Sequence, residues 1–205
     1  MSQAPARHVP TLLSVLALAG CLTSAAQASP NPVVYRVNPT LSTVEFSLSK
    51  WTVTRQVSLF RALEGTIALS PDRPEGAAVD IRVDAASLDT RNETRDDVVR
   101  SEDFLHVSAH RFIRFRSTSV RRNGSGSFDV TGDLTLRGVT RRIVAPVRFL
   151  GITRAEGLGE LAAFETSFVI DRRDFGVLGS RWSGGRAILG DEVTVHLAIT
   201  ALRAD

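Results

Sequence analysis

The chain has 205 residues, 43% of them hydrophobic, which is enough to bury one sizeable core and gives no sign of two domains. Its formal charge is only +3, and 24 of its 25 basic residues are arginine, the exception being Lys50. Such a balanced charge argues against nucleic acid as a partner and indicates an arginine-rich composition more than a recognition surface.

The first 20 residues are typical of a secretory signal peptide. A short basic start at Arg7 and His8 precedes the apolar stretch 9–19, which is too short to span a bilayer as a permanent helix. We therefore expect an exported protein that works in the bacterial periplasm.

Two cleavage sites fit this signal. Leu18-Ala19-Gly20-Cys21 resembles a bacterial lipobox, whose cysteine is lipidated and becomes the first mature residue, whereas cleavage after Ala28 would release a soluble periplasmic protein. Cys21 is the only cysteine of the chain, which favours lipidation at Cys21. Residues 21–33 would then be a tether, and residues 34–205 the folded domain.

From Val33 onward the apolar residues recur with a period of two, as in strands that bury one face. Phe128, Val130, Leu134 and Leu136 alternate with polar neighbours, and four other segments repeat the pattern, at 79–85, 143–149, 162–170 and 193–201. Turn-forming residues separate these segments. We count roughly eight antiparallel strands, a number that can close into a barrel or pack as a sandwich, and periodicity does not separate the two.

One dense block of charge interrupts the strands. The fifteen residues 89–103 carry nine charges and predict one short helix near residues 91–100. Thr90 and Glu93 have the spacing of a capping box, in which each side chain bonds to the backbone amide of the other residue. A second short turn, starting at Ser101, would direct Phe104 towards the interior.

The side chains of this helix have two interpretations. Asn92, Arg95 and Asp96 share a face, and Arg100 lies on the next turn. Arg95, Asp96 and Arg100 could form an ion-pair network with Asp103 that pins the helix across the mouth of a barrel. They could also contact the head group of a ligand, and the two roles are compatible.

The same block carries a resemblance to a known family. Ser87-Leu88-Asp89-Thr90-x-Asn92-x-x-Arg95-Asp96, followed by Arg100-Ser101-x-Asp103-Phe104, resembles the signature of the YceI-like family of bacterial polyisoprenoid-binding, lipocalin-like periplasmic proteins. Four further segments are similar to the family in the same order and extend the resemblance from residue 35 to about 202: Pro39–Phe46, Gly132–Thr140, Ile170–Gly176 and Leu189–Val193.

The resemblance implies an extended antiparallel β-barrel that encloses an isoprenoid chain, such as that of a polyprenyl phosphate or a quinone. Burial at ~0.8 kcal/mol per carbon would give roughly 4 kcal/mol gross for each isoprene unit, and ordering the chain would take back part of it. The candidate ligand-binding residues are Phe46, Trp51, Phe60, Asn92, Arg95, Asp96, Arg100, Phe104, Phe115, Phe164, Phe168, Arg172 and Trp182. Phe112 and Phe115 fall on opposite faces of one strand, so only one of them is expected to point inward.

The chain departs from the family where the head group of a ligand would lie. Val98 replaces the histidine that relatives commonly carry, and Lys50-Trp51-Thr52 replaces an early His-x-Gly segment. The stretch 179–186 adds Trp182 and two arginines on a loop that would be either a lid or a solvated hairpin tip. These changes leave the head group undetermined.

Catalysis has little support in the sequence. His106 and His110 are spaced like metal ligands, but no thiol or patterned carboxylate completes the set, and His196 falls on the polar face of its strand. We expect no enzyme, no metal and no cofactor, with an isoprenoid lipid as the bound ligand. We also expect no contact with nucleic acid and contact with a membrane only through Cys21, and a homodimer is one arrangement that the sequence allows.

Two functions from different classes follow. The first is a carrier that encloses a long-chain isoprenoid, and the second is a structural or stress-related module whose barrel is filled by its own side chains. A continuous apolar cavity would favour the carrier, and a packed interior the module.

Overall fold

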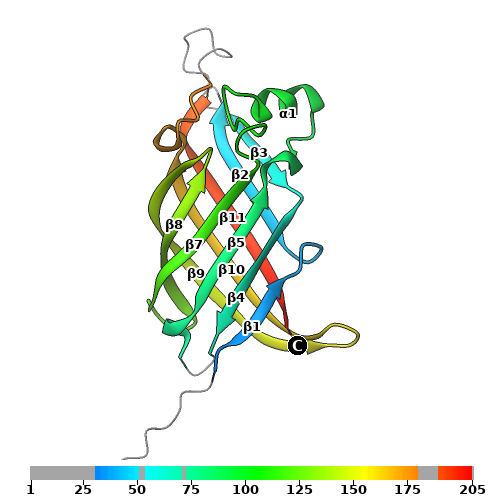
Figure 1. Ribbon diagram of the computed structural model, residues 1–205, viewed down its shortest axis with the longest axis vertical. Coiled ribbons are helices and arrows are strands. Elements are labelled where there is room, and N and C mark those ends of the chain that lie inside the picture. The colour runs from blue at the N-terminus through cyan, green and yellow to red at the C-terminus, as the bar shows by residue number, and fades with distance from the viewer. Residues whose placement is uncertain (1–30, 51–53, 71–72, 180–188, 205) are drawn as a thin grey trace, which may run out of the picture.

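The computed structural model describes residues 31–50, 54–70, 73–179 and 189–204 as an antiparallel β-barrel with one α-helix at one end (Figure 1). The strands are β1 Val33–Val37, β2 Thr43–Lys50, β3 Thr54–Phe60, β4 Leu63–Leu69, β5 Ala78–Asp84, β6 Leu88–Asp89, β7 Phe112–Arg122, β8 Ser127–Leu136, β9 Val139–Ala155, β10 Gly159–Asp171 and β11 Leu189–Arg203. The helix is α1 Glu93–Arg100, and three 3-10 turns are η1 Pro74–Gly76, η2 Ala85–Ser87 and η3 Arg172–Phe175.

The barrel closes through eight strands. Their order is β1-β4-β5-β7-β8-β9-β10-β11, and β11 pairs back to β1. The other three strands extend this wall. β2 pairs with the same edge of β11 as β1 does, but with an earlier part of β11. β3 then pairs with β2, and β6 pairs with β3. The prediction of an extended barrel of about eight strands is therefore confirmed, and the sandwich is excluded.

Side-chain alternation explains where the core lies. In β8 every second residue is buried, beginning with Phe128 and ending with Leu136, while the residues between them are only partly buried. The inward faces of the other strands converge on the same space and form one main apolar cluster, and a smaller cluster gathers Val120, Phe128 and Val130. The period of two in the sequence thus predicted the inside and outside of the wall correctly.

The absence of a side chain at Gly132 makes room for the ring of Phe115. A Cβ atom at Gly132 would come within 2.5 Å of the Phe115 ring and of the Arg116 carbonyl oxygen. Gly132 lies opposite Ser117 in the β7–β8 ladder, where the register shifts between Ser117 and Ser119. The absent side chain lets Phe115 lie flat over β8 and point inward. Phe112, on the other face, is 40% exposed and packs under the Arg82 guanidinium.

The helix begins two residues later than predicted, and its cap is a different residue. Asn92 is the N-cap, and its side-chain oxygen accepts a 2.9 Å hydrogen bond from the Arg95 amide. Arg91 adopts a left-handed backbone with φ of 63°, which breaks the continuous turn that a Thr90–Glu93 capping box requires. The capping-box prediction was wrong, and Thr90 serves α1 through other contacts described below.

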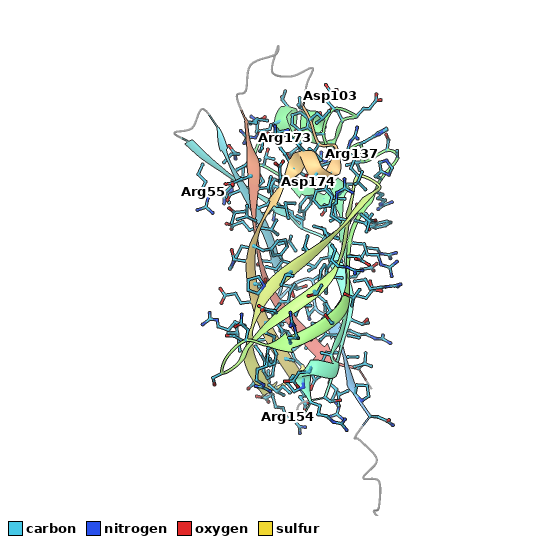
Figure 2. All side chains as sticks on the ribbon, turned by 90° about the vertical axis from the view of Figure 1, so that its left-hand side faces the viewer. Arg55, Asp103, Arg137, Arg154, Arg173 and Asp174 are labelled. Atoms are coloured by element: carbon cyan, nitrogen blue, oxygen red, sulfur yellow. The ribbon has the colours of Figure 1, made fainter. Side chains whose placement is uncertain are left out.

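Ion pairs between neighbouring strands cover much of the outer wall. Asp80 on β5 accepts hydrogen bonds from Arg114 at 2.6 Å and from Arg116 at 3.1 Å, both on β7, and the bond from Arg114 is the main reason that the pKa of Asp80 is lowered. Figure 2 shows such side chains pointing away from the barrel along its length. Exposed pairs of this kind contribute about 0.2–1 kcal/mol each, so the arginines serve mainly solubility and strand register.

Candidate functional site

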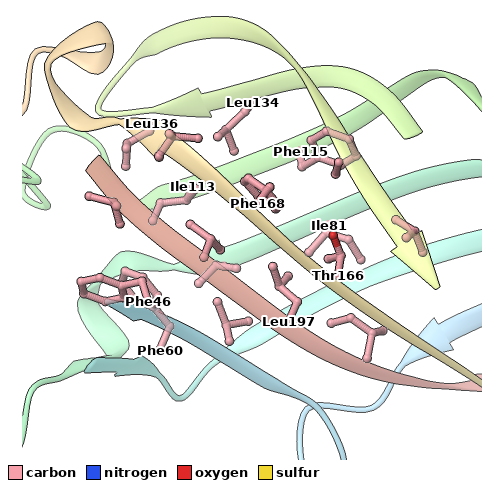
Figure 3. A pocket seen from close by; sticks show the side chains of 18 of the residues that line it. Phe46, Phe60, Ile81, Ile113, Phe115, Leu134, Leu136, Thr166, Phe168 and Leu197 are labelled. Atoms are coloured by element: carbon pink, nitrogen blue, oxygen red, sulfur yellow. The ribbon is translucent and has the colours of Figure 1, made fainter. Parts of the chain in front are cut away.

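The inward faces of the barrel enclose a long apolar cavity of about 310 Å³ (Figure 3). Strands β2 to β5 and β7 to β11 all contribute to its wall, together with α1. Eight phenylalanines line it: Phe46, Phe60, Phe104, Phe115, Phe128, Phe149, Phe164 and Phe168. The rings of Phe46 and Phe60 stack with centroids 5.1 Å apart, and those of Phe149 and Phe164 lie 5.3 Å apart. A cavity of this lining favours a flexible hydrocarbon guest, which needs apolar contact and no fixed polar partners.

One hydroxyl lies in the middle of this apolar wall. Thr166 projects from β10 between Phe164 and Phe168 and lines the cavity with them (Figure 3). Its Oγ1 atom is buried and has no hydrogen-bond partner among the residues that the structure describes. Leaving a buried hydroxyl unpaired costs about 1–3 kcal/mol, so this position is not optimised for stability.

A single cation reaches the cavity from α1. Arg95 lines the cavity, and its Nε and Nη2 atoms donate to Oγ1 and the carbonyl oxygen of Thr90, at 2.8 and 2.6 Å. Within the described part of the chain no carboxylate forms an ion pair with Arg95. The guanidinium has further donors for an acceptor that enters from the cavity.

The other charged residues of α1 hold the helix in place. The buried Asp96 accepts a 2.8 Å hydrogen bond from the Thr90 amide through Oδ1. Arg100 donates to the Leu88 carbonyl oxygen at 2.5 Å and lies 3.9 Å from the Asp96 carboxylate. Asn92 is occupied as the N-cap. These three residues are absent from the cavity wall, and their contacts hold α1 in place, whereas Arg95 lines the cavity.

Arg172 lines the cavity too, but its guanidinium is already saturated. It donates to the carbonyl oxygens of Val177, Leu178, Leu189 and Gly190 at 2.5–3.4 Å, and to Oδ1 of Asp191 at 3.0 Å. Its side chain is only 12% exposed. These bonds tie η3 and the chain that follows it to the start of β11. Arg172 therefore builds the wall and has no donor left for a head group.

The end of the barrel opposite α1 is closed by a buried tyrosine. Tyr35 on β1 is 0% exposed, and its hydroxyl donates a 2.8 Å hydrogen bond to Oε1 of Glu160 on β10. Burial is the main reason, and the bond to Glu160 the second, that the pKa of Tyr35 rises to about 12. We call Tyr35, Glu160 and Arg203, which also donates to Glu160, the floor of the barrel.

This pKa predicts a loss of stability in alkali. The unfolded chain loses the phenol proton near pH 10, whereas the folded chain holds it to about 12, so the unfolded state binds fewer protons between these values. The stability that protonated Tyr35 contributes to the fold is therefore fully present below pH 10 and is lost as the pH rises towards 12. Tyr35 is the only tyrosine, so phenolate absorbance reports it directly. Urea unfolding of wild type and Tyr35→Phe across this range should show a steeper decline for wild type, and parallel curves would contradict the assignment.

Comparison with known proteins places this barrel in a family. The family model for the YceI-like domain matches residues 35–201. The chain belongs to the YceI-like family. A UPF0312 protein of Azotobacter vinelandii is 33% identical over 165 residues, covering 80% of this chain and 86% of that protein. A UPF0312 protein of Ectopseudomonas mendocina is 36% identical over 134 residues, covering 65% of this chain and 70% of that protein.

Solved structures share the YceI-like barrel. Burkholderia cenocepacia BcnA superposes with a TM-score of 0.72 at 20% identity, covering 80% of this chain and 99% of that one. A polyisoprenoid binding domain from Saccharophagus degradans, implicated in plant cell wall breakdown, superposes with a TM-score of 0.64 at 16% identity, covering 84% of this chain and 99% of that one. At these identities the likeness establishes the fold.

The YceI-like cavity brings together most of the residues selected from the sequence. Those in its wall are Phe46, Phe60, Arg95, Phe104, Phe115, Phe164, Phe168 and Arg172. Contact of these residues with a ligand remains a prediction. Trp51, Trp182 and Cys21 lie outside the described residues, as does most of the loop 179–186. Phe128 and Phe149 also line the cavity and were not selected, although their inward position follows from the same alternation.

Two further observations concern a metal site and a membrane-spanning helix. The rings of His106 and His110 meet edge to face with centroids 5.5 Å apart, and in the described part of the chain no group of three or more His, Cys, Asp or Glu residues is arranged to hold a metal ion. Among the described residues no helix has the length and hydropathy needed to cross a membrane.

Proposed function

We propose that this protein binds a long-chain isoprenoid lipid, with the chain in the barrel cavity and the head group at the α1 end, and carries or sequesters it in the bacterial periplasm. The observation that carries the proposal is the cavity, whose wall is apolar along its length. Membership of the YceI-like family and the fold shared with a polyisoprenoid binding domain support it. A barrel that served only as a structural module would gain stability by filling this space.

The chemistry points to binding and not to catalysis. An isoprenoid chain needs apolar contact, and each buried unit contributes roughly 4 kcal/mol before the cost of ordering it. The polar side chains of the wall are mostly occupied by the protein itself, as Arg172 shows. Of the two arginines in the described cavity wall, Arg95 is the one with free donors, which suits an anionic head group such as a phosphate, and it would also serve a quinone carbonyl.

Organic extraction and native mass spectrometry of protein freshly purified from a bacterium test the proposal. We expect a bound species of lipid mass and, after its removal, uptake of an added polyprenyl phosphate or ubiquinone. Protein that is empty on purification and takes up neither ligand would refute the carrier function.

Substitution of Arg95 identifies the head group. Arg95→Ala should weaken polyprenyl phosphate binding by about tenfold or more and leave ubiquinone binding less affected, because a charge-assisted hydrogen bond contributes roughly 1.5–3 kcal/mol. Arg121→Ala, on an exposed residue of β7, is the control. If Arg95→Ala lowers only the melting temperature, Arg95 serves the loop at Thr90 and not the ligand.

We also propose that the chain is exported and held at a membrane through a lipid on Cys21. The lipobox-like segment and the single cysteine support this location. Cys21→Ala should move the protein from the membrane fraction to the soluble periplasmic fraction. An unchanged membrane fraction would leave cleavage after Ala28 as the better account.

A further inference from the structure

The inward residues that follow the cavity wall towards the floor of the barrel are small. On β10 the cavity wall ends at Phe164 and on β11 at Ile199, and the next inward positions are Ala162 and Ala201. These two alanines lie directly opposite each other, and both are 0% exposed. Something must cover them, because an alanine side chain cannot exclude water from the end of a barrel alone.

The Tyr35 ring is placed to cover them. Tyr35 starts on β1, opposite Arg203 of β11, and its hydroxyl reaches Glu160 on β10. The ring therefore crosses the inside of β11, where the small alanines leave room for it. Tyr35 also lies opposite Ile67 of β4, and Ile67 does line the cavity. The phenol ring thus fills space that would otherwise continue the cavity.

We propose that Tyr35 is the stop that sets the length of isoprenoid chain the cavity accepts. The inference rests on the proposed function and adds a length specificity to it. A chain that fills the space up to Tyr35 buries all of its units, whereas the last unit of a longer chain finds no apolar contact and must bend back or stay outside. The Tyr35 side chain is fully buried, so the packing around the ring holds the stop in place.

The test is a competition among polyprenols that differ by one isoprene unit, bound to delipidated protein and read by native mass spectrometry. Tyr35→Ala removes a group of about the size of one unit, so the preferred length should increase by about one unit. Ile67→Phe adds bulk beside the stop, so it should shorten the preferred length. We expect the ratio of two neighbouring lengths to change by about tenfold or more in each variant, in opposite directions.

Tyr35→Phe is the matched control, because it keeps the ring and loses only the hydroxyl. It should retain the wild-type length profile while the alkaline phenolate signal disappears. If thermal unfolding shows that Tyr35→Ala does not fold, the preferred polyprenol lengths of Tyr35→Leu and Ile67→Phe test the length stop instead. Unchanged length profiles in folded variants would overturn the length stop and leave the carrier function standing. A wild-type protein that takes up no polyprenol of any length would overturn both.

Discussion

Arg172→Ala should cost about 3–5 kcal/mol of folding stability, because it removes a buried cation from five acceptors at once. Four of these acceptors are backbone carbonyls, two in the chain that follows η3 and two at the start of β11, and each one left without a partner costs about 1–3 kcal/mol where water cannot replace the donor. Urea unfolding followed by circular dichroism measures the loss.

The neighbouring arginine is a close control. Arg173 forms ion pairs with Asp171 and Asp191, at 3.4 and 3.1 Å, but its side chain is 58% exposed. Arg173→Ala should therefore cost much less stability than Arg172→Ala. Equal losses of unfolding free energy in the two variants would show that the buried hydrogen bonds of Arg172 stabilise the fold no more than the exposed ion pairs of Arg173. Arg172→Lys should recover little, since one ammonium cannot reach acceptors spread around a planar guanidinium.

The buried and exposed faces of the strands were predictable from local patterns. Alternation in segments such as Phe128–Leu136 determines which face of each strand is buried, but the choice of a barrel over a sandwich came from the family resemblance and not from periodicity. The breaks at residues 38–42, 61–62 and 85–87 were not predictable, because they depend on how neighbouring strands share one edge of β11. The N-cap at Asn92 depends in the same way on the left-handed turn at Arg91, which the sequence does not reveal.

The candidate site was predictable where it is apolar and less so where it is polar. A phenylalanine such as Phe164 lines the cavity because the alternation of side chains along its strand directs it inward. Arg95 and Arg172 have the same chemistry in the sequence, yet Arg172 uses all its donors within the protein and Arg95 does not. Hydrogen-bond partners distant in sequence make that difference, and pattern alone does not supply them. The role of Tyr35 likewise depends on Glu160, which is 125 residues away.

Thr166→Trp should abolish isoprenoid binding without unfolding the barrel. Thr166 lies at the middle of the β10 segment that lines the cavity, so a larger side chain at this position would extend into the cavity. A cavity of roughly 150 Å³ is enough to hold benzene, so one of about 310 Å³ has room for an indole. The indole would displace at least one isoprene unit and block the path to those beyond it. We expect affinity to fall by about a hundredfold or more, with an unchanged or higher melting temperature.

Ser167→Trp places the same side chain on the outer face, where residue 167 is exposed opposite His196. It should bind polyprenyl phosphate and ubiquinone as well as wild type does. Thr166→Val adds a second control, because it removes the unpaired hydroxyl at nearly constant volume and should raise stability while keeping the guest. If Thr166→Trp folds and still binds the lipid with wild-type affinity, the chain does not lie in the barrel. The apolar surface that binds it would then have to be sought on the outer wall, where Leu150 and Val169 are each more than half exposed.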